Sequence, residues 1–220
     1  MSEQPSPQRT APDLIRAFGD VEVPTAGLWN VPPGWATIEL AVPRLLGTTM
    51  RSKIRLKQGM IAIADDPSHS TAHLSLDALS IRTGEEAIDE FLQRDVLDVD
   101  RYSTIPVRIA SVQHISGPAW TADGWITVRG VTTPIDFDIT YEGVFRKGPA
   151  AFFRAQASLP LRHILPMNSG LRGRFFAGRT LRVAMEVYAE PVRATAEQSA
   201  RRRLPHMAAV STARRTPVYA

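Results

Sequence analysis

The residues that could do chemistry are few, and the most closely spaced are two histidines. His69 and His73 follow Asp65 and Asp66 directly in the chain. A metal site needs three or four converging ligands. Period-two alternation places both histidines on the solvent side of a strand near a turn, and the two carboxylates belong to that turn. The pattern predicts surface histidines, and no metal site.

A second candidate is the carboxylate pair of Asp95 and Asp98. Two carboxyl groups at this spacing could share acid–base work, but after a helix they more simply cap and solvate the turn. His114 and His163 are isolated, and the chain holds no cysteine and no Gly-x-Ser-x-Gly, Walker or dinucleotide-binding pattern. We therefore expect a protein that is not an enzyme, with no catalytic residue.

The composition is that of a globular chain: 220 residues, 44% hydrophobic and 22% charged. Charge-free stretches such as 59–64 are far shorter than the roughly 20 apolar residues of a membrane span. Residues 1–10 are polar and proline-rich, without the apolar segment of a secretory signal peptide. The expectation is a cytoplasmic location.

Basic residues concentrate near the C-terminus. The net charge is +4, and residues 193–220 contain arginine at 193, 201–203, 214 and 215 against one glutamate, at 197. This segment has few large apolar groups to bury, which predicts disorder. Clustered cations attract phosphate, but no aromatic side chains interleave to stack on bases, so nucleic-acid binding is not expected. The arginines would weakly favour an anionic membrane surface, at about 1 kcal/mol each.

Between the two ends, apolar residues occupy every second position. The runs cover 71–76, 135–142, 153–159 and 181–188, and further runs cover about 36–42, 48–56 and 105–115. Such alternation is typical of strands with one apolar and one wet face. Because barrel closure removes exposed edges, the sequence predicts an all-β, mainly antiparallel barrel of about eight strands. Such a barrel is filled by side chains or holds one slender ligand.

One segment breaks this alternation. Ile88, Phe91 and Leu92 fall at helical spacing, and Thr83 followed by Glu86 matches a capping box, which predicts one short helix near 84–94. A short helical turn is also expected near 13–18. The predicted organisation is an N-terminal arm over 1–27, partly disordered, a barrel domain over 28–192 and a basic disordered tail over 193–220.

Three segments and one tryptophan carry a family resemblance. They are Ser80-Ile81-Arg82-Thr83-Gly84, the run with Asp89, Leu92, Asp95, Asp98, Val99 and Tyr102, the stretch from Gly124 to Pro134, and Trp29. In this order they resemble the YceI-like family, polyisoprenoid-binding proteins with a lipocalin-like antiparallel barrel, over residues 29–190. Each motif alone is weak, whereas the three together are specific.

The chain departs from the family pattern at several places. Pro32-Pro33-Gly34-Trp35 replaces the family's Asp-x-x-His-Ser, and Arg44-Leu45 replaces a His-Leu pair. Phe91-Leu92 stands for His-Leu, Val96-Leu97 for Phe-Phe, and Ser103 for a proline. The late Asp-Arg-x-x-Phe-Gly element is lost around 161–166. The resemblance therefore covers the scaffold better than the details of a pocket.

The resemblance implies a carrier or sequestering protein for a long apolar isoprenoid, such as a polyprenyl lipid or a prenyl quinone, with no other cofactor. The lining residues expected for it are Leu40, Val42, Leu45, Leu92, Leu97, Ile105, Phe137, Ile139, Phe153, Leu181 and Val183. Arg44 and Arg94 are the candidates for a head group at the mouth. The alternative is a filled, ligand-free barrel that acts as an adaptor through its surface and basic tail. Whether the protein forms a homodimer is left open by the sequence.

Overall fold

The structure is a computed structural model that describes residues 14–43, 48–145, 149–164 and 180–192. Within these ranges the chain is built mostly of antiparallel strands, with one short α-helix, α1 (Glu86–Phe91). The strands are β1 (Ile15–Phe18), β2 (Val21–Pro24), β3 (Gly27–Val31), β4 (Ala36–Pro43), β5 (Thr49–Ile63), β6 (Thr71–Arg82), β7 (Thr104–Ser116), β8 (Ala119–Val128), β9 (Val131–Phe145), β10 (Ala150–Pro160) and β11 (Thr180–Pro191).

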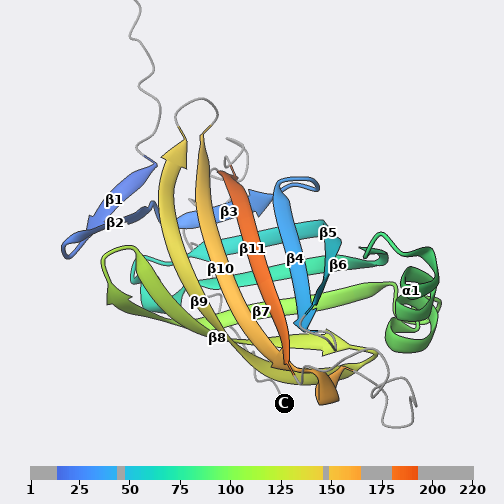
Figure 1. Cartoon of the computed structure of the whole chain (residues 1–220). Coiled ribbons are helices and arrows are strands. Elements are labelled where there is room, and N and C mark those ends of the chain that lie inside the picture. Colours follow the sequence, from blue (N-terminus) through green and yellow to red (C-terminus); the bar gives the residue numbers. More distant parts are fainter. Residues whose placement is uncertain (1–13, 44–47, 146–148, 165–179, 193–220) are drawn as a thin grey trace, which may run out of the picture.

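Strands β4 to β11 form a closed barrel. Each pairs with the next one along the chain, and β11 pairs back with β4, so the ring has eight strands (Figure 1). The prediction of an all-β, eight-stranded antiparallel barrel with a single short helix is confirmed. Alternation along each strand directs one set of side chains inward, as the period-two pattern requires. Trp29, Ile38 and Leu159, each 1% exposed, lie in the resulting core.

The first barrel strand is interrupted. β3 and β4 occupy one position in the ring, because both pair with β5 on one side and with β11 on the other. Pro32 and Pro33 cannot donate to a ladder, and the chain turns there, with the Trp35 amide donating to the Pro32 carbonyl at 3.1 Å. The segment that departs from the family pattern is thus where this strand breaks.

The N-terminal segment forms a β-hairpin, so the expected helical turn near 13–18 is wrong for its described part. β1 and β2 pair antiparallel through a turn at Gly19 and Asp20, with Gly19 at a φ of 62°. Phe18, Val21 and Val23 pack against Trp120 of β8. This contact with a distant strand decides the conformation. In Figure 1 the hairpin and α1 lie at opposite ends of the barrel.

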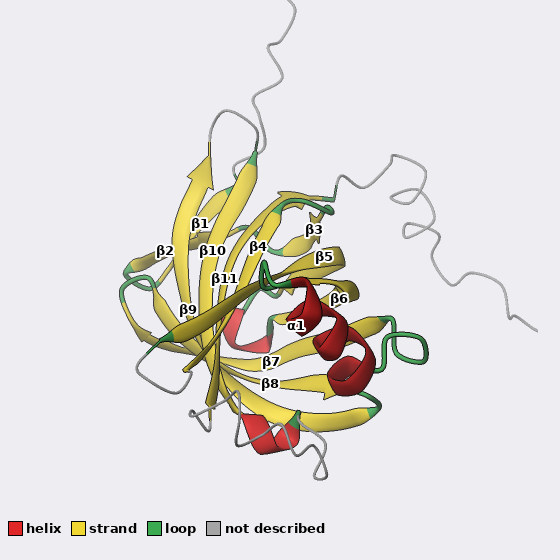
Figure 2. Cartoon of the chain, turned by 45° about the vertical axis from the view of Figure 1, so that its right-hand side comes forward, coloured by secondary structure: helices red, strands yellow, loops and turns green. Residues whose placement is uncertain are grey.

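The helix differs from its prediction at both ends. Its N-cap is Glu85, and no side-chain hydrogen bond caps it. Instead of Glu86, Asp89 reaches back, because its Oδ1 accepts from both the Thr83 amide and the Thr83 hydroxyl at 2.6 Å. The predicted capping box is therefore wrong. The helical path also continues beyond 94, as a π-helical segment over Leu92–Leu97 that ends at Asp98, with a φ of 51° (Figure 2).

None of the described helices is long and apolar enough to cross a membrane. The predicted basic tail, residues 193–220, lies outside the described residues.

Candidate functional site

Two apolar cavities lie inside the barrel. The hairpin-end cavity has a volume of about 110 Å³. Its wall comes from inward-facing residues of β5 to β11, and Val23 and Pro24 of β2 add to it from the N-terminal hairpin. Because Val23 is 3% exposed, the hairpin belongs to the wall of this cavity as well as to its cover.

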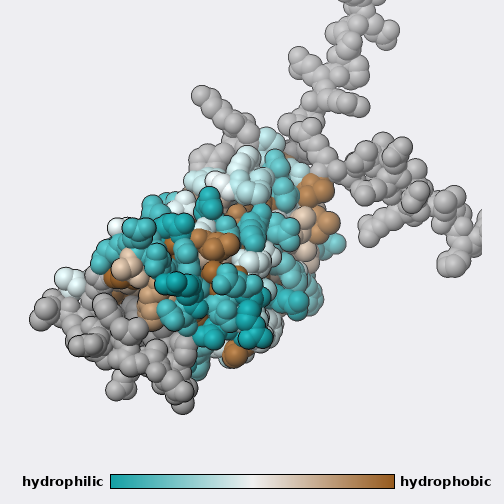
Figure 3. All heavy atoms as spheres, turned by 90° about the vertical axis from the view of Figure 1, so that its right-hand side faces the viewer, coloured by the Kyte–Doolittle hydropathy of each residue, from teal (hydrophilic) through white to brown (hydrophobic). Residues whose placement is uncertain are grey.

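The helix-end cavity has a volume of about 90 Å³. Leu92, Val96 and Leu97 of the π-helical segment close it, together with Leu161 and Ile164 after β10. A π-helical turn inserts one residue into the helical path. These three side chains are buried towards the barrel, while the surface on the side that carries α1 is mostly hydrophilic (Figure 3).

Met185 of β11 lines both cavities. It is 3% exposed and pairs with Ala155 of β10 on one side and with Ile38 of β4 on the other. An unbranched thioether side chain adapts readily to irregular space. Met185 is therefore the one described residue that the walls of both cavities share.

The expected lining residues fall on these walls. Ile139 and Phe153 line the hairpin-end cavity. The helix-end cavity is lined by Leu40, Val42, Leu92, Leu97, Ile105, Phe137, Leu181 and Val183. Leu45 lies outside the described residues. The positions follow from alternation, whereas the binding role assigned to them stays a prediction.

Of the two arginines expected at the mouth, the structure describes Arg94. Arg44 lies outside the described residues. Arg94 follows α1, where its side chain is 70% exposed and pairs with Glu90 at 3.3 Å, and it does not line either cavity. The apolar face of this helical segment is turned to the barrel, so Arg94 projects on the opposite side.

Polar side chains on the cavity walls are few among the described residues. Ser52 lies in the helix-end cavity, and Ser70, Thr71 and Tyr141 lie in the hairpin-end cavity. Ser70 is satisfied, since its hydroxyl accepts from the Ala64 amide at 3.1 Å. The Tyr141 hydroxyl is buried without a hydrogen-bond partner. Burial raises the pKa of Tyr141 to about 12, and the Glu22 carboxylate adds to that shift.

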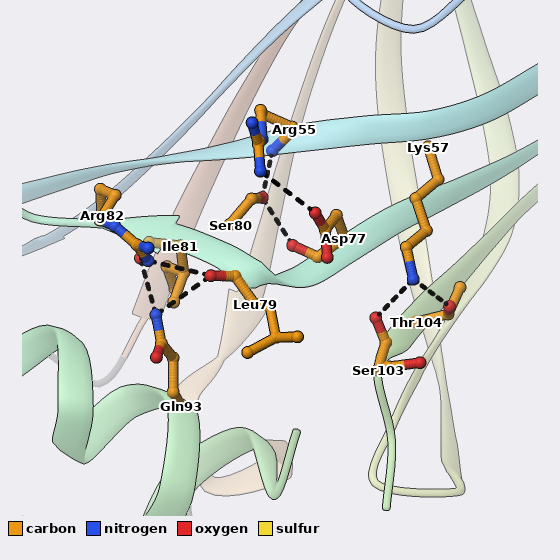
Figure 4. Close-up of polar contacts among 10 residues, drawn as sticks. All are labelled: Arg55, Lys57, Asp77, Leu79, Ser80, Ile81, Arg82, Gln93, Ser103 and Thr104. Atoms are coloured by element: carbon orange, nitrogen blue, oxygen red, sulfur yellow. Dashed lines mark hydrogen bonds and ion pairs between the residues drawn. The ribbon is translucent and has the colours of Figure 1, made fainter. Parts of the chain in front are cut away.

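Hydrogen bonds fix the helical segment to the barrel at the end of β6. Gln93 donates from Nε2 to the Leu79 and Ile81 carbonyls, at 3.1 and 3.4 Å (Figure 4). These carbonyls can accept from the helical segment because β6 bulges after Asp77. At the bulge the Ser80 hydroxyl accepts from the Arg55 amide at 2.7 Å and donates to the Asp77 carbonyl at 2.6 Å. The Ser80–Gly84 motif is thus the docking point of the helix.

The turn between β8 and β9 meets the same segment. Arg129 and Gly130 both have positive φ, 52° and 76°, as a two-residue hairpin turn requires. Arg129 donates from Nη1 to the Asp95 carbonyl at 3.2 Å, and a Cβ on Gly130 would lie 3.4 Å from the Tyr102 ring. The three motifs converge on one end of the barrel and close the helix-end cavity.

The closely spaced histidines and acidic residues of the 65–73 segment make at most a pair in the described structure. His69 ends a short 3₁₀-helix (Pro67–His69) rather than lying on a strand, and its Nδ1 is 3.9 Å from Asp66. The Ser68 amide and hydroxyl hold the pKa of the Asp66 carboxyl below its usual value. No cluster of three or more potential metal ligands occurs in the part of the chain that the structure describes.

Comparison with known proteins assigns the family. The model of the YceI-like domain matches residues 29–175, which is most of the chain. The chain belongs to the YceI-like family. No curated protein sequence matches it.

Solved structures show the same YceI-like fold at low sequence identity. BcnA of Burkholderia cenocepacia superimposes with a TM-score of 0.59 at 10% identity, over 70% of this chain and 95% of its own. A polyisoprenoid-binding domain of Saccharophagus degradans gives 0.60 at 12% identity, over 76% and 100%. The YCEI protein of Campylobacter jejuni gives 0.55 at 16% identity, over 66% and 87%.

Three parts of this site were not foreseen from the YceI-like pattern. The hairpin residues Val23 and Pro24 precede the matched domain. Met185 and Tyr141 were identified as members of alternating strands, which gives their direction but not their neighbours. A tyrosine on an otherwise apolar inward face was the available signal for a special position, since a buried hydroxyl usually has a partner.

Proposed function

We propose that this protein binds a slender apolar lipid of the isoprenoid type inside the barrel, without covalent attachment, and carries or sequesters it. The observation behind the proposal is the pair of apolar cavities that meet at Met185. None of the described residues that line them is charged. Such a wall favours a hydrocarbon chain over a polar substrate.

The cavity sizes set a minimum length for the ligand. A cavity of roughly 150 Å³ with apolar walls takes one benzene, so each cavity here matches about one five-carbon unit. Burying such a unit contributes about 4 kcal/mol, and association costs on the order of 4 kcal/mol or more. Two such units fill the two cavities, and a third is needed to span the junction at Met185. The proposed ligand is therefore a chain of about three isoprene units or longer that displaces the Met185 side chain.

The family assignment supports the class of ligand. The Saccharophagus degradans structure is described as a polyisoprenoid-binding domain, and the helix end that its family motifs build closes one of the cavities here. A polyprenyl lipid or a prenyl quinone meets the length requirement. The proposed function needs no other cofactor.

The first experiment is mass spectrometry of the purified protein, in its native state and after extraction with organic solvent. A stoichiometric prenyl species that is released on denaturation supports the proposal and names the ligand. Empty protein is then offered farnesol and longer prenyl alcohols in a binding assay. If it neither contains nor takes up a prenyl lipid, the proposal fails, and an adaptor role for the barrel surface gains weight.

A blocked cavity provides the structural control. Ala155 faces the hairpin-end cavity and is 6% exposed, whereas Ala184, on the neighbouring strand β11, faces outward. Ala155→Trp fills the cavity and should abolish farnesol uptake, while Ala184→Trp adds the same side chain outside and should leave uptake unchanged. Equal uptake by both variants would show that the ligand does not lie in this cavity.

A further inference from the structure

The side chain of Tyr141 is the polar group that the proposed function leaves unexplained. It projects from β9 into the wall of the hairpin-end cavity and is 7% exposed. Its ring lies 5.5 Å from that of Phe153, centroid to centroid. Its hydroxyl has no hydrogen-bond partner, and among the described residues only Arg16 Nε shares that condition.

An unpartnered buried hydroxyl is unfavourable for the empty protein. Folding removes it from water without a replacement bond, and a phenylalanine would fill the same space without that cost. A ligand oxygen within reach of the hydroxyl would supply the missing partner. The unpartnered hydroxyl is therefore suited to be a polar contact for a bound ligand.

The surroundings select a neutral oxygen. Burial and the Glu22 carboxylate both raise the pKa of Tyr141, so this part of the barrel disfavours negative charge. The described wall of the cavity offers no cation to pair with a phosphate or a carboxylate, and burying an unpaired anion is very costly. A hydroxyl or a carbonyl oxygen carries no such cost.

The hairpin encloses this hydroxyl. Val23 and Pro24 complete the cavity wall beside it, and Arg16 of β1 donates from Nη2 to the Ala64 carbonyl at 2.7 Å, which ties the hairpin to the end of β5. A hydrogen bond made away from water is stronger than one made in it. The hairpin thus keeps the polar contact dry.

We propose that Tyr141 is the polar anchor of the ligand: its hydroxyl bonds a neutral oxygen, alcohol or carbonyl, at one end of the prenyl chain. The oxygen end then lies under the hairpin, and the chain runs past Met185 towards the helix end. This inference rests on the proposed function and adds to it the chemical class of the head group.

The test compares three probes that share one carbon skeleton: farnesol, the hydrocarbon farnesene and farnesyl diphosphate. Their affinities for the full-length protein are measured by competition with a fluorescent apolar probe. We expect farnesol to bind about tenfold more tightly than farnesene, the ratio typical of one hydrogen bond in a dry site. Farnesyl diphosphate should bind most weakly.

Tyr141→Phe should remove the preference for the alcohol and leave the farnesene affinity within about twofold. The control is Tyr188→Phe, because Tyr188 stacks on Phe152 at 4.5 Å and does not line either cavity. It should keep the tenfold ratio. Since the Tyr141 hydroxyl lacks a partner, Tyr141→Phe should also melt no lower than the wild type.

Each outcome separates this inference from the proposed function. Equal binding of farnesol and farnesene by the wild type, or a preference for the diphosphate, overturns the anchor while a lipid-binding barrel stands. Binding of none of the three overturns the proposed function itself. If Tyr141→Phe does not fold, wild-type protein labelled with fluorotyrosine replaces it. One tyrosine ¹⁹F signal should then shift further with farnesol than with farnesene, and equal shifts or an unchanged spectrum overturn the anchor.

Discussion

Truncating the Met185 side chain tests whether one ligand occupies both cavities of the barrel. Met185→Ala shortens the side chain that lines both cavities, which opens space between them for about three methylene groups. A prenyl chain that crosses the junction can fill this space, and a chain confined to one cavity cannot. The gain for the crossing chain is about 2 kcal/mol, or roughly thirtyfold in affinity.

The assay measures farnesol and the shorter geraniol side by side. In Met185→Ala the ratio of the two affinities should rise roughly thirtyfold in favour of farnesol. The matched control is Met50→Ala, because Met50 is similarly buried, at 7% exposure, but lines only the helix-end cavity. That variant enlarges one cavity without joining the two, so the ratio should stay near its wild-type value.

Both methionine variants should lose about 2–5 kcal/mol of stability. Binding is therefore measured at low temperature, after thermal unfolding has shown that each variant is folded. The reasoning is refuted if the ratio of affinities does not change in Met185→Ala, or if Met50→Ala raises it equally. Either result would mean that Met185 does not stand between two parts of one binding site.

Three further outcomes follow from the geometry. Asp89→Ala should lower the free energy of unfolding in urea by about 3 kcal/mol, because the buried Asp89 carboxylate accepts two hydrogen bonds. The control Glu86→Ala should cost almost nothing, and equal losses in the two variants would contradict the role given to Asp89 at the helix start. Gly124→Ala should lower stability by about 1–3 kcal/mol, since a Cβ there would lie 2.7 Å from the Phe137 ring, and an unchanged melting temperature would refute this close packing. The pKa of Tyr141 is about 12 in the folded state and about 10 in an unfolded chain, because burial penalises the ionised phenol. Its titration therefore leaves stability unchanged below pH 10 and lowers it by about 2–3 kcal/mol as pH rises towards 12. Tyr141→Phe should flatten that decline in denaturant unfolding, and an equally steep decline in the variant would be evidence against this account.

The barrel could be predicted from the sequence because its strands are long and one-sided. The runs at 135–142 and 181–188 alternate strictly, and a period-two pattern fixes both the element and the direction of each side chain. This is why the inward direction of the side chains on β9 and β11 follows from the sequence. The barrel also follows from such strands, since an open sheet would leave two exposed edges.

The parts that were missed depend on neighbours in space. Residues 15–18 are too few to separate helix from strand by pattern, and their hairpin is held by Trp120, about a hundred residues away in the sequence. The capping box at Thr83 failed because Asp89, buried by the barrel, competes better for the same amide. The Tyr141 hydroxyl lacks a partner because of which residues surround it in the folded cavity, and the sequence does not show those neighbours.

The closing strand of the barrel has a practical consequence for expression of the domain. The family match ends at residue 175, whereas β11 covers Thr180–Pro191. A protein trimmed to the matched residues would lose the strand that bridges β10 and β4. Two long edges with unpaired amides and carbonyls would then face solvent, and such edges recruit strands from other molecules. We expect the trimmed protein to aggregate, and a fragment meant for crystallisation or ligand screening should extend through Val192.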